Sequence, residues 1–168
     1  MSGGAAQETA TRVTGTVGDD VDVPSAVLFA CSMNAIRSPM AAATLSHLAG
    51  SRIYVASAGV RAGEPDGFAI AVMNEIGIDI SKHQPHTLDD LNDTSFDLII
   101  SLSPEAHHQA LELTRTMAVD VEYWPTLDPS LMNHEGRRDD VLMYYRQARD
   151  QLFAKIKQRF RLEGGPSI

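Results

Sequence analysis

Apolar residues in this chain fall into short continuous runs that alternate with longer stretches of helical spacing. A short continuous run is typical of a strand that is covered on both faces of a sheet. Runs of this kind lie at residues 26–30, 53–57, 96–102 and 119–124, and we predict a strand at each of them. The centre of the third run, at residues 98–100, gives the strongest signal.

The stretches between these runs have helical features. Pro39 would lie in the first turn of a helix, where its missing N–H costs little, and Gly77 lies where a C-terminal cap belongs. In the last stretch, apolar residues form one stripe from Val141 to Phe160. We predict helices at residues 38–48, 66–76, 88–91, 104–114 and 139–160.

Strands that alternate with helices predict a parallel sheet with helices on both faces. The expected fold class is therefore α/β: a single doubly wound domain over residues 25–162, with a four-stranded parallel sheet and about five helices. Ligands of such sheets bind at the carboxyl ends of the strands. Residues 1–24 contain few large apolar side chains and are expected to form a disordered tail, and residues 163–168 a flexible C-terminus.

The charge balance limits the classes of partner. The 168 residues include 14 Lys and Arg and 22 Asp and Glu, for a net charge of −8. This argues against a general binder of nucleic acid or anionic membranes, because such binding needs a basic face, but a local basic pocket can still hold an anionic small substrate. No apolar run approaches the ~18 residues of a membrane span, and the N-terminus lacks the pattern of a secretory signal. We expect no nucleic-acid or membrane partner, and a cytoplasmic location.

Cys31 is the single cysteine of the chain. It rules out an intramolecular disulfide or a Cys-rich zinc site, and it suits a reducing compartment. Cys31 directly follows the first predicted strand, and Arg37 and Ser38 lie six and seven residues beyond it, where a helix is predicted to begin. Consecutive backbone N–H groups at a helix start form an anion site, and a thiol placed there ionises more readily. We therefore interpret Cys31 as a nucleophile rather than as a small core residue.

The other residues of this loop fit an oxyanion site. Arg37 can hold two oxygens of one oxyanion in a fork. The Ser38 hydroxyl can donate to the thiolate and so improve it as a leaving group. Asn34 is one of the few residue types that tolerate a left-handed backbone in such a loop. The predicted phosphate-binding residues are Ser32, Met33, Asn34, Ala35, Ile36 and Arg37.

The loop resembles that of the low-molecular-weight protein tyrosine phosphatase family and its arsenate reductase relatives, and the resemblance extends from about residue 26 to residue 160. The most specific matches are residues 31–39 and the pair Asp128-Pro129. Weaker matches lie at residues 57–59, 65–66, 77–81 with His83, and 96–100. The resemblance implies a sheet order of 2-1-3-4. It also implies hydrolysis of phosphomonoesters through a phosphocysteine, with no metal and no other cofactor.

The resemblance also implies roles for further residues. Cys31 would attack phosphorus, and Asp128, which follows the fourth predicted strand, would give a proton to the leaving alkoxide or phenolate. Asp-Pro is also a common turn pair, so a plain turn role for Asp128 stays open. A network that braces the loop is implied for Asn34, Ser38, Ser57 and His83.

The chain departs from the family's pattern at three places. Met33 stands where the family usually has glycine, so its side chain narrows the pocket or alters the loop. Ile36 replaces a second cysteine that often precedes the arginine, so the catalytic thiol has no partner in the loop for a protective disulfide. The two tyrosines that follow Asp-Pro in eukaryotic members are absent, and we expect Trp124 and Leu131 to form the substrate wall instead.

Histidines and tyrosines outside the loop fit structural roles better. No further ligand spacing completes a metal site with His83 and His86, so we predict no metal. The adjacent residues His107 and His108 point to different sides of a predicted helix and are interpreted as surface residues. The pair at residues 144–145 fits a packed helix face.

Three functions stay open from the sequence. The leading one is cysteine-dependent hydrolysis of a phosphomonoester, either phosphotyrosine in a protein or a small aryl phosphate, with inorganic phosphate as product. The second is reduction of arsenate, which has the shape and charge of phosphate, with an external low-molecular-weight thiol. The third is a non-catalytic phosphate-binding module, to which Met33 alone points. The sequence predicts no particular oligomeric state.

Overall fold

The computed structural model describes residues 23–91, 95–132 and 136–162 of the chain. The tails expected at residues 1–24 and 163–168 lie outside the described residues, apart from Val23 and Pro24. Within the described ranges, no helix is both long enough and apolar enough to cross a membrane.

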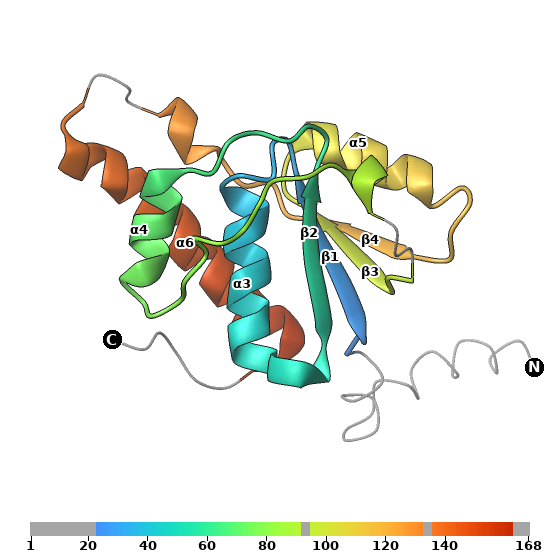
Figure 1. Cartoon of the computed structure of the whole chain (residues 1–168). Coiled ribbons are helices and arrows are strands. Elements are labelled where there is room, and N and C mark those ends of the chain that lie inside the picture. Colours follow the sequence, from blue (N-terminus) through green and yellow to red (C-terminus); the bar gives the residue numbers. More distant parts are fainter. Residues whose placement is uncertain (1–22, 92–94, 133–135, 163–168) are drawn as a thin grey trace, which may run out of the picture.

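A four-stranded parallel sheet forms the centre of the described chain. Its strands are β1 Ala26–Cys31, β2 Tyr54–Gly59, β3 Leu98–Ser101 and β4 Asp120–Tyr123. Their order is β2-β1-β3-β4, which confirms the predicted sheet and its order (Figure 1). The register pairs Cys31 with Gly59 and Ala30 with Ser101. The carboxyl ends of the three strands therefore meet at one edge of the sheet.

Four α-helices pack around this sheet in the described residues. They are α3 Arg37–Ala49, α4 Gly67–Asn74, α5 Pro104–Leu113 and α6 Arg138–Phe160, close to four of the predicted ranges. The fifth helix, predicted at residues 88–91, is wrong: the chain makes a single 3₁₀ turn at Leu88–Asp90. Reciprocal bonds between Thr87 and Asp90 close this turn, and the backbone is extended again at Leu91. Two further 3₁₀ turns lie at Gly50–Arg52 and Pro129–Leu131.

Alternate residues of the strands contribute to two separate apolar cores, one on each face of the sheet. Val27 and Phe29 of β1 pack on the side of α3, α4 and α6, whereas Leu28 and Ala30 pack on the side of α5. Figure 1 shows these helices on opposite sides of the sheet. Cys31 continues the first alternation and belongs to the core beneath α3. The alternation of side chains along β1 therefore determines that the Cys31 thiol lies on the face of the sheet that α3 covers.

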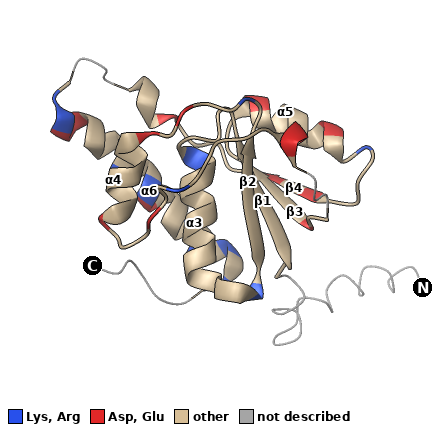
Figure 2. Ribbon diagram, viewed as in Figure 1, with Lys and Arg blue, Asp and Glu red and all other residues tan. Residues whose placement is uncertain are grey.

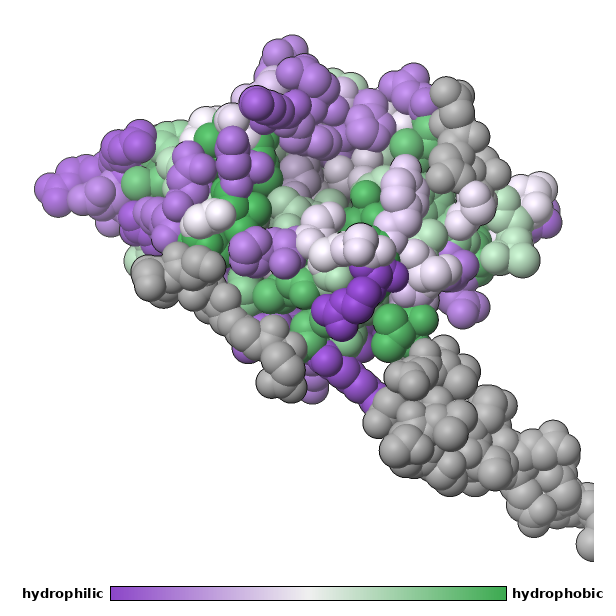
Figure 3. Space-filling model, turned by 60° about the horizontal axis from the view of Figure 1, so that its bottom comes forward, coloured by the Kyte–Doolittle hydropathy of each residue, from purple (hydrophilic) through white to green (hydrophobic). Residues whose placement is uncertain are grey.

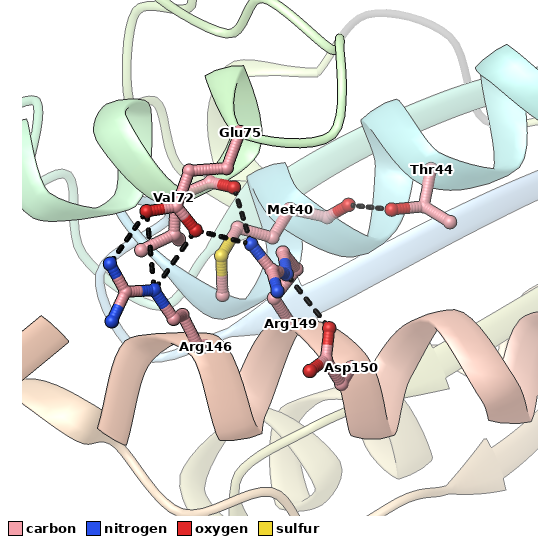
Figure 4. Close-up of polar contacts among 7 residues, drawn as sticks. All are labelled: Met40, Thr44, Val72, Glu75, Arg146, Arg149 and Asp150. Carbon is pink, nitrogen blue, oxygen red and sulfur yellow. Dashed lines mark hydrogen bonds and ion pairs between the residues drawn. The ribbon is translucent and has the colours of Figure 1, made fainter. Parts of the chain in front are cut away.

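Charged side chains join α4 to α6 at the edge of the larger core (Figure 4). The Arg149 side chain is only 10% exposed, and it donates to the Val72 carbonyl and to a Glu75 carboxylate oxygen, each at 2.8 Å. Arg146 also binds Glu75, at 2.7 Å, but its side chain is 40% exposed. Breaking a buried pair leaves an unpaired buried charge, whereas an exposed pair is screened by water.

This difference in burial predicts unequal losses of stability. We expect Arg149→Ala to lower the free energy of unfolding by about 3 kcal/mol, because the Val72 carbonyl and Glu75 lose a buried donor. The matched change Arg146→Ala should cost less than about 1 kcal/mol. Urea denaturation of both variants measures the difference, and equal losses would contradict the assignment.

The same cluster predicts a dependence on pH. Hydrogen bonds from Arg146 hold the pKa of the Glu75 carboxyl below its ordinary value of 4.5. A depressed folded-state pKa gives stability that is fully present above pH 4.5 and is lost as the pH falls through the folded value. The stability difference between the wild type and Arg146→Ala should therefore shrink in acid below pH 4.5, as denaturation at a series of pH values would show.

Candidate active site

The loop between β1 and α3, residues 31–37, lies at the carboxyl edge of the sheet. Cys31 is 2% exposed, and its Sγ lies 2.9 Å from the Ser38 Oγ in the first turn of α3. The hydroxyl is thus within reach to donate to the sulfur, as expected from the sequence. Pro39 follows in the same turn of α3, where the missing N–H leaves no helix bond unmade.

Three successive carbonyls of the loop accept hydrogen bonds from the segment that follows β2. The bonds run from Val60 N to Cys31 O, from Arg61 N to Ser32 O and from Gly63 N to Met33 O, at 3.1, 2.8 and 2.9 Å. The carbonyls therefore point out toward residues 60–63. The amides of residues 33–36 make no hydrogen bond with another described residue, so they are free for an anion.

Asn34 organises the middle of the loop. Its φ is 55°, the left-handed conformation expected there. Its Nδ2 donates to Ser38 Oγ and to Ser57 Oγ, each at 2.9 Å, and its Oδ1 accepts from the His86 N–H at 3.0 Å. His83 Nε2 lies 3.0 Å from both the Oδ1 and the main-chain carbonyl of Asn34. The four residues proposed to brace the loop thus form one network, which the backbone of His86 completes.

Burial gives the His83 imidazole a pKa below its ordinary value of 6.5. The ring is therefore neutral at pH 7. A neutral ring that carries its proton on Nε2 can donate to both oxygens of Asn34, so it fixes the carbonyl of Asn34 as residues 60–63 fix those of the preceding residues.

A pocket of about 160 Å³ opens above the loop. Residues from three segments line it: the loop itself, the segment between β2 and α4, and the turn between β4 and α6. They are Cys31, Met33, Ala35, Ile36, Arg37, Gly63, Glu64, Asp66, Asp128 and Ser130. The predicted nucleophile, arginine and acid thus share one cavity, although Asp128 lies 97 residues from Cys31 (128 − 31) in the sequence.

Arg37 and Asp128 face each other across the pocket. The Arg37 guanidinium is buried, donates to the Thr126 carbonyl at 2.9 Å, and lies 3.7 Å from Asp128 Oδ2. Asp128 Oδ1 accepts from the N–H and the Oγ of Ser130, at 2.9 and 2.7 Å. One oxygen of Asp128 therefore closes a turn, as one sequence interpretation expected, and the other lies next to Arg37 in the pocket, where the acid role stays a prediction.

The sequence missed four residues of the pocket, which are Gly63, Glu64, Asp66 and Ser130. Asp66 caps α4, with Oδ1 accepting from Ala69 N at 3.0 Å, and its Oδ2 accepts from the Tyr145 hydroxyl at 3.0 Å. Burial, followed by the Asp66 carboxylate, raises the pKa of Tyr145, so its hydroxyl stays protonated as the donor. The sequence signal for Asp66 was a capping residue at a predicted helix start, which by itself indicates no pocket.

The predicted substrate wall is wrong. Trp124 is buried, packs edge-on against Phe29 at 6.2 Å, and does not line the pocket. The backbone N–H of Trp124 donates to the Ser101 carbonyl. This bond continues the pairing of β4 with β3 by one residue, and the ring packs into the core. Leu131 is 70% exposed and also lies outside the lining. Met33, 39% exposed, is the large apolar side chain of the pocket rim instead.

The prediction that His107 and His108 are both surface residues is confirmed for His108 and wrong for His107. His108 is exposed, whereas His107 is half-buried and stacks on the Tyr123 ring at 4.4 Å. Its Nδ1 lies 2.8 Å from Ser101 Oγ, at the end of β3. The expected packed helix face is present at Tyr145, which is 2% exposed. Among the described residues, no group of three or more His, Cys, Asp or Glu could hold a metal ion.

The fold and this site together define an α/β protein that presents a thiol, an arginine and free amides at the carboxyl edge of a parallel sheet. Residues 26–162 match the family model described as low molecular weight phosphotyrosine protein phosphatase. The chain belongs to this enzyme family, which confirms the resemblance seen in its sequence.

Similar proteins include arsenate reductases as well as phosphatases. The arsenate reductase of Shouchella clausii is 32% identical over 134 residues, which cover 79% of this chain and 92% of that protein. The glutaredoxin arsenate reductase of Synechocystis is 37% identical over 76 residues, 45% of this chain and 58% of that protein, so the match spans little more than half of it.

Solved structures show the same fold. The mutant YwlE from Bacillus subtilis superposes with a TM-score of 0.66 at 25% identity, covering 81% of this chain and 96% of that one. An arsenate reductase in its phosphate-binding state gives a TM-score of 0.61 at 27% identity, covering 82% and 97%.

The close contact of Gly59 with the loop predicts a sharp effect of a single methyl group. A Cβ at Gly59 would lie 2.5 Å from Arg61 O and 2.8 Å from Asn34 N, both backbone atoms. We expect Gly59→Ala to shift the loop, to weaken phosphate binding strongly, and to lower the free energy of unfolding by about 1–3 kcal/mol. Calorimetric titration with phosphate and urea denaturation measure the two effects.

Gly63→Ala is the matched control for this prediction. A Cβ at Gly63 would lie 3.2 Å from the Cβ of Met33 and 3.4 Å from its Cε. Because these contacts are with side-chain atoms and need only a small shift, this variant should bind phosphate with an affinity close to that of the wild type. Equal loss of binding in the two variants would show that contact with the loop backbone is not the cause.

Proposed function

We propose that this protein hydrolyses phosphomonoesters, with phosphotyrosine or another aryl phosphate as substrate, through a phosphocysteine on Cys31. The observation that carries the proposal is the position of Asp128: its carboxylate lines the same pocket as Cys31 and lies 3.7 Å from Arg37. A leaving phenolate or alkoxide needs a proton, and a carboxylic acid opposite the nucleophile can supply it.

In the first step the Cys31 sulfur attacks phosphorus and the bond from phosphorus to the ester oxygen breaks. The free amides of the loop and the Arg37 guanidinium hold the remaining oxygens, since phosphoryl transfer depends on positioning and charge stabilisation. Asp128 gives its proton to the leaving oxygen. Ser38, 2.9 Å from the sulfur, holds the thiolate before the attack.

In the second step a water molecule attacks phosphorus. Asp128, now ionised, takes a proton from the water, and the bond between sulfur and phosphorus breaks. Inorganic phosphate leaves and the thiolate is restored. Ser38 then favours this departure by donating a hydrogen bond to the sulfur.

Arsenate reduction is the second candidate, and the names of several relatives favour it. The Cys31 sulfur would displace one arsenate oxygen as water. An external thiol would then attack the sulfur, giving a mixed disulfide and arsenite, so that two thiols supply the two electrons. A relay through further cysteines of these 168 residues is excluded, because Cys31 is their single cysteine. The oxygen that leaves as water also needs a proton, which Asp128 can supply, so the acid by itself serves both reactions.

The third candidate, a phosphate-binding module without activity, rested on Met33. The Met33 side chain lies against Gly63 at the rim, and a cavity of about 160 Å³ stays open above Cys31. This arrangement supports a catalytic pocket, since Met33 does not fill the space that a phosphoryl group needs.

The acid role of Asp128 predicts a dependence on the leaving group. We expect Asp128→Asn to slow turnover by about 10²–10³-fold for a phenyl or alkyl phosphate, and much less for p-nitrophenyl phosphate, whose leaving group needs little protonation. Ser130→Ala keeps the carboxylate and should slow all these esters by one small common factor. Steady-state kinetics across leaving-group pKa values test this, and equal slowing by Asp128→Asn would remove it from the acid role.

Assay of arsenate separates the two leading candidates. The wild type should hydrolyse p-nitrophenyl phosphate, Cys31→Ser should not, and arsenite formation with arsenate and glutathione should be negligible by comparison. Thiol-dependent arsenite formation without phosphatase activity would overturn the proposal in favour of arsenate reduction. If the protein is inactive in both assays but still binds phosphate, the third candidate, a phosphate-binding module without activity, would be favoured.

A further inference from the structure

The mouth of the pocket carries more negative than positive charge. Among the described residues that line it, Glu64, Asp66 and Asp128 are carboxylates and Arg37 is the single cation. Figure 2 shows acidic ribbon in the segments above the basic start of α3. A pocket for free oxyanions gains from cations at its mouth, so this pattern is unexpected for such a ligand.

Two of the three carboxylates are already engaged by the protein. Asp66 accepts from Ala69 N with one oxygen and from the Tyr145 hydroxyl with the other. Asp128 accepts from Ser130 with one oxygen and lies 3.7 Å from Arg37 with the other. Their charges are therefore partly compensated within the fold.

Glu64 differs from both. It is exposed, and it makes no hydrogen bond or ion pair with another described residue. Its backbone is nevertheless held in place, because Gly63 bonds to the loop on one side and Asp66 caps α4 on the other. A carboxylate that has no partner among the described residues thus lines the pocket from a backbone that is held on both sides.

The basic side chains of Arg61 and Arg138 are engaged elsewhere and make no ion pair with Glu64. Arg61 points to α5, where it forms two bonds with Glu105 at 2.6 and 2.8 Å. Arg138, at the start of α6, lies over the Phe68 ring at 5.5 Å and is not among the residues that line the pocket. A cation for Glu64 can therefore come from a substrate.

Two exposed leucines flank Asp128 in the sequence, and neither of them lines the pocket. Leu127 and Leu131, on either side of Asp128, are 76% and 70% exposed, the highest values among large apolar residues in the described chain. Figure 3 shows the side of the molecule that is at the bottom of Figure 1, away from the pocket, where apolar residues lie in patches among hydrophilic ones. Selection of a substrate within the pocket therefore falls to Glu64 rather than to these leucines.

We propose that Glu64 is a specificity-determining residue, and that the pocket selects phosphorylated peptides with a lysine or arginine next to the phosphorylated residue. The proposal rests on the phosphatase function above and names its substrate class. The basic side chain pairs with Glu64 while the phosphoryl group enters the loop. Free inorganic oxyanions and acidic peptides carry no such cation and are repelled by the same carboxylate.

Phosphotyrosyl peptides that differ at one position test this. The residue beside phosphotyrosine is lysine in one peptide and glutamate in the other, and kcat/KM is measured for each at low salt. One exposed charge pair changes kcat/KM by up to about fivefold. Attraction of the lysine and repulsion of the glutamate by Glu64 should therefore together give the wild type a preference of about tenfold for the lysine peptide. The preference should shrink in molar salt, which screens exposed charges.

Variants assign the preference to Glu64. Glu64→Gln should reduce the ratio to about twofold, and Glu64→Lys should reverse it. Glu112→Gln, an exposed carboxylate on α5 away from the pocket, is the matched control and should keep the wild-type ratio. Inorganic phosphate should inhibit Glu64→Gln about threefold more strongly than the wild type, because a repulsive charge is gone.

The outcomes separate this inference from the proposed function. If the wild type hydrolyses p-nitrophenyl phosphate but treats both peptides equally, or if Glu64→Gln keeps the full preference, the inference is wrong and the phosphatase function stands. If the wild type hydrolyses neither p-nitrophenyl phosphate nor the peptides, the proposed function is wrong and the inference falls with it.

Discussion

The site depends on one constraint, which is that the carbonyls of the loop after β1 are held outward. In a peptide unit the C=O and N–H point in opposite directions, so fixing the one outward turns the other inward. Residues 60–63 and His83 supply the bonds that hold four successive carbonyls. The loop amides and the first turn of α3 then face the same space as the Cys31 sulfur. An anion site follows from hydrogen bonds that stabilise the backbone itself.

The topology of the sheet provides those partners. Because β2 lies beside β1 in parallel register, with Gly59 opposite Cys31, the chain that leaves β2 runs alongside the loop. Gly59 allows this approach, since any side chain there would collide with backbone atoms. The segment then continues past Glu64 to the cap of α4 at Asp66, which Tyr145 of α6 also binds. The charges at the mouth are therefore fixed by the contacts that join α4 and α6 to the sheet.

The sequence predicted those features that depend on the local pattern of residues. The apolar runs gave the four strands, helical spacing gave the four α-helices, and the loop from Cys31 to Ser38 was evident as an anion site. The network around Asn34 and the sheet order came from resemblance to a family. The turn at residues 88–91 was too short for apolar spacing to distinguish a helix from a 3₁₀ turn.

The failed predictions concern positions that depend on tertiary structure. Trp124 is four residues from Asp128 in the sequence, but it continues the alternation of β4 and enters the core, whereas Asp128 lies in the turn beyond. Glu64 lies in a stretch without periodicity, and its place at the pocket follows from the register of β2. His107 is half-buried because Tyr123, on the edge strand, stacks on it.

The carboxylates at the mouth of the pocket also affect the choice between hydrolysis of a phosphate ester and reduction of arsenate. A covalent intermediate on Cys31 meets either water or an external thiol, and thiols react as anions. Water approaches past Glu64 and Asp128 without electrostatic cost, and Asp128 can take its proton. A thiolate meets the same carboxylates as repulsive charges. These 168 residues contain no second cysteine to attack from within, so the proposed hydrolysis agrees with the charge at the mouth, and reduction would need an external thiol.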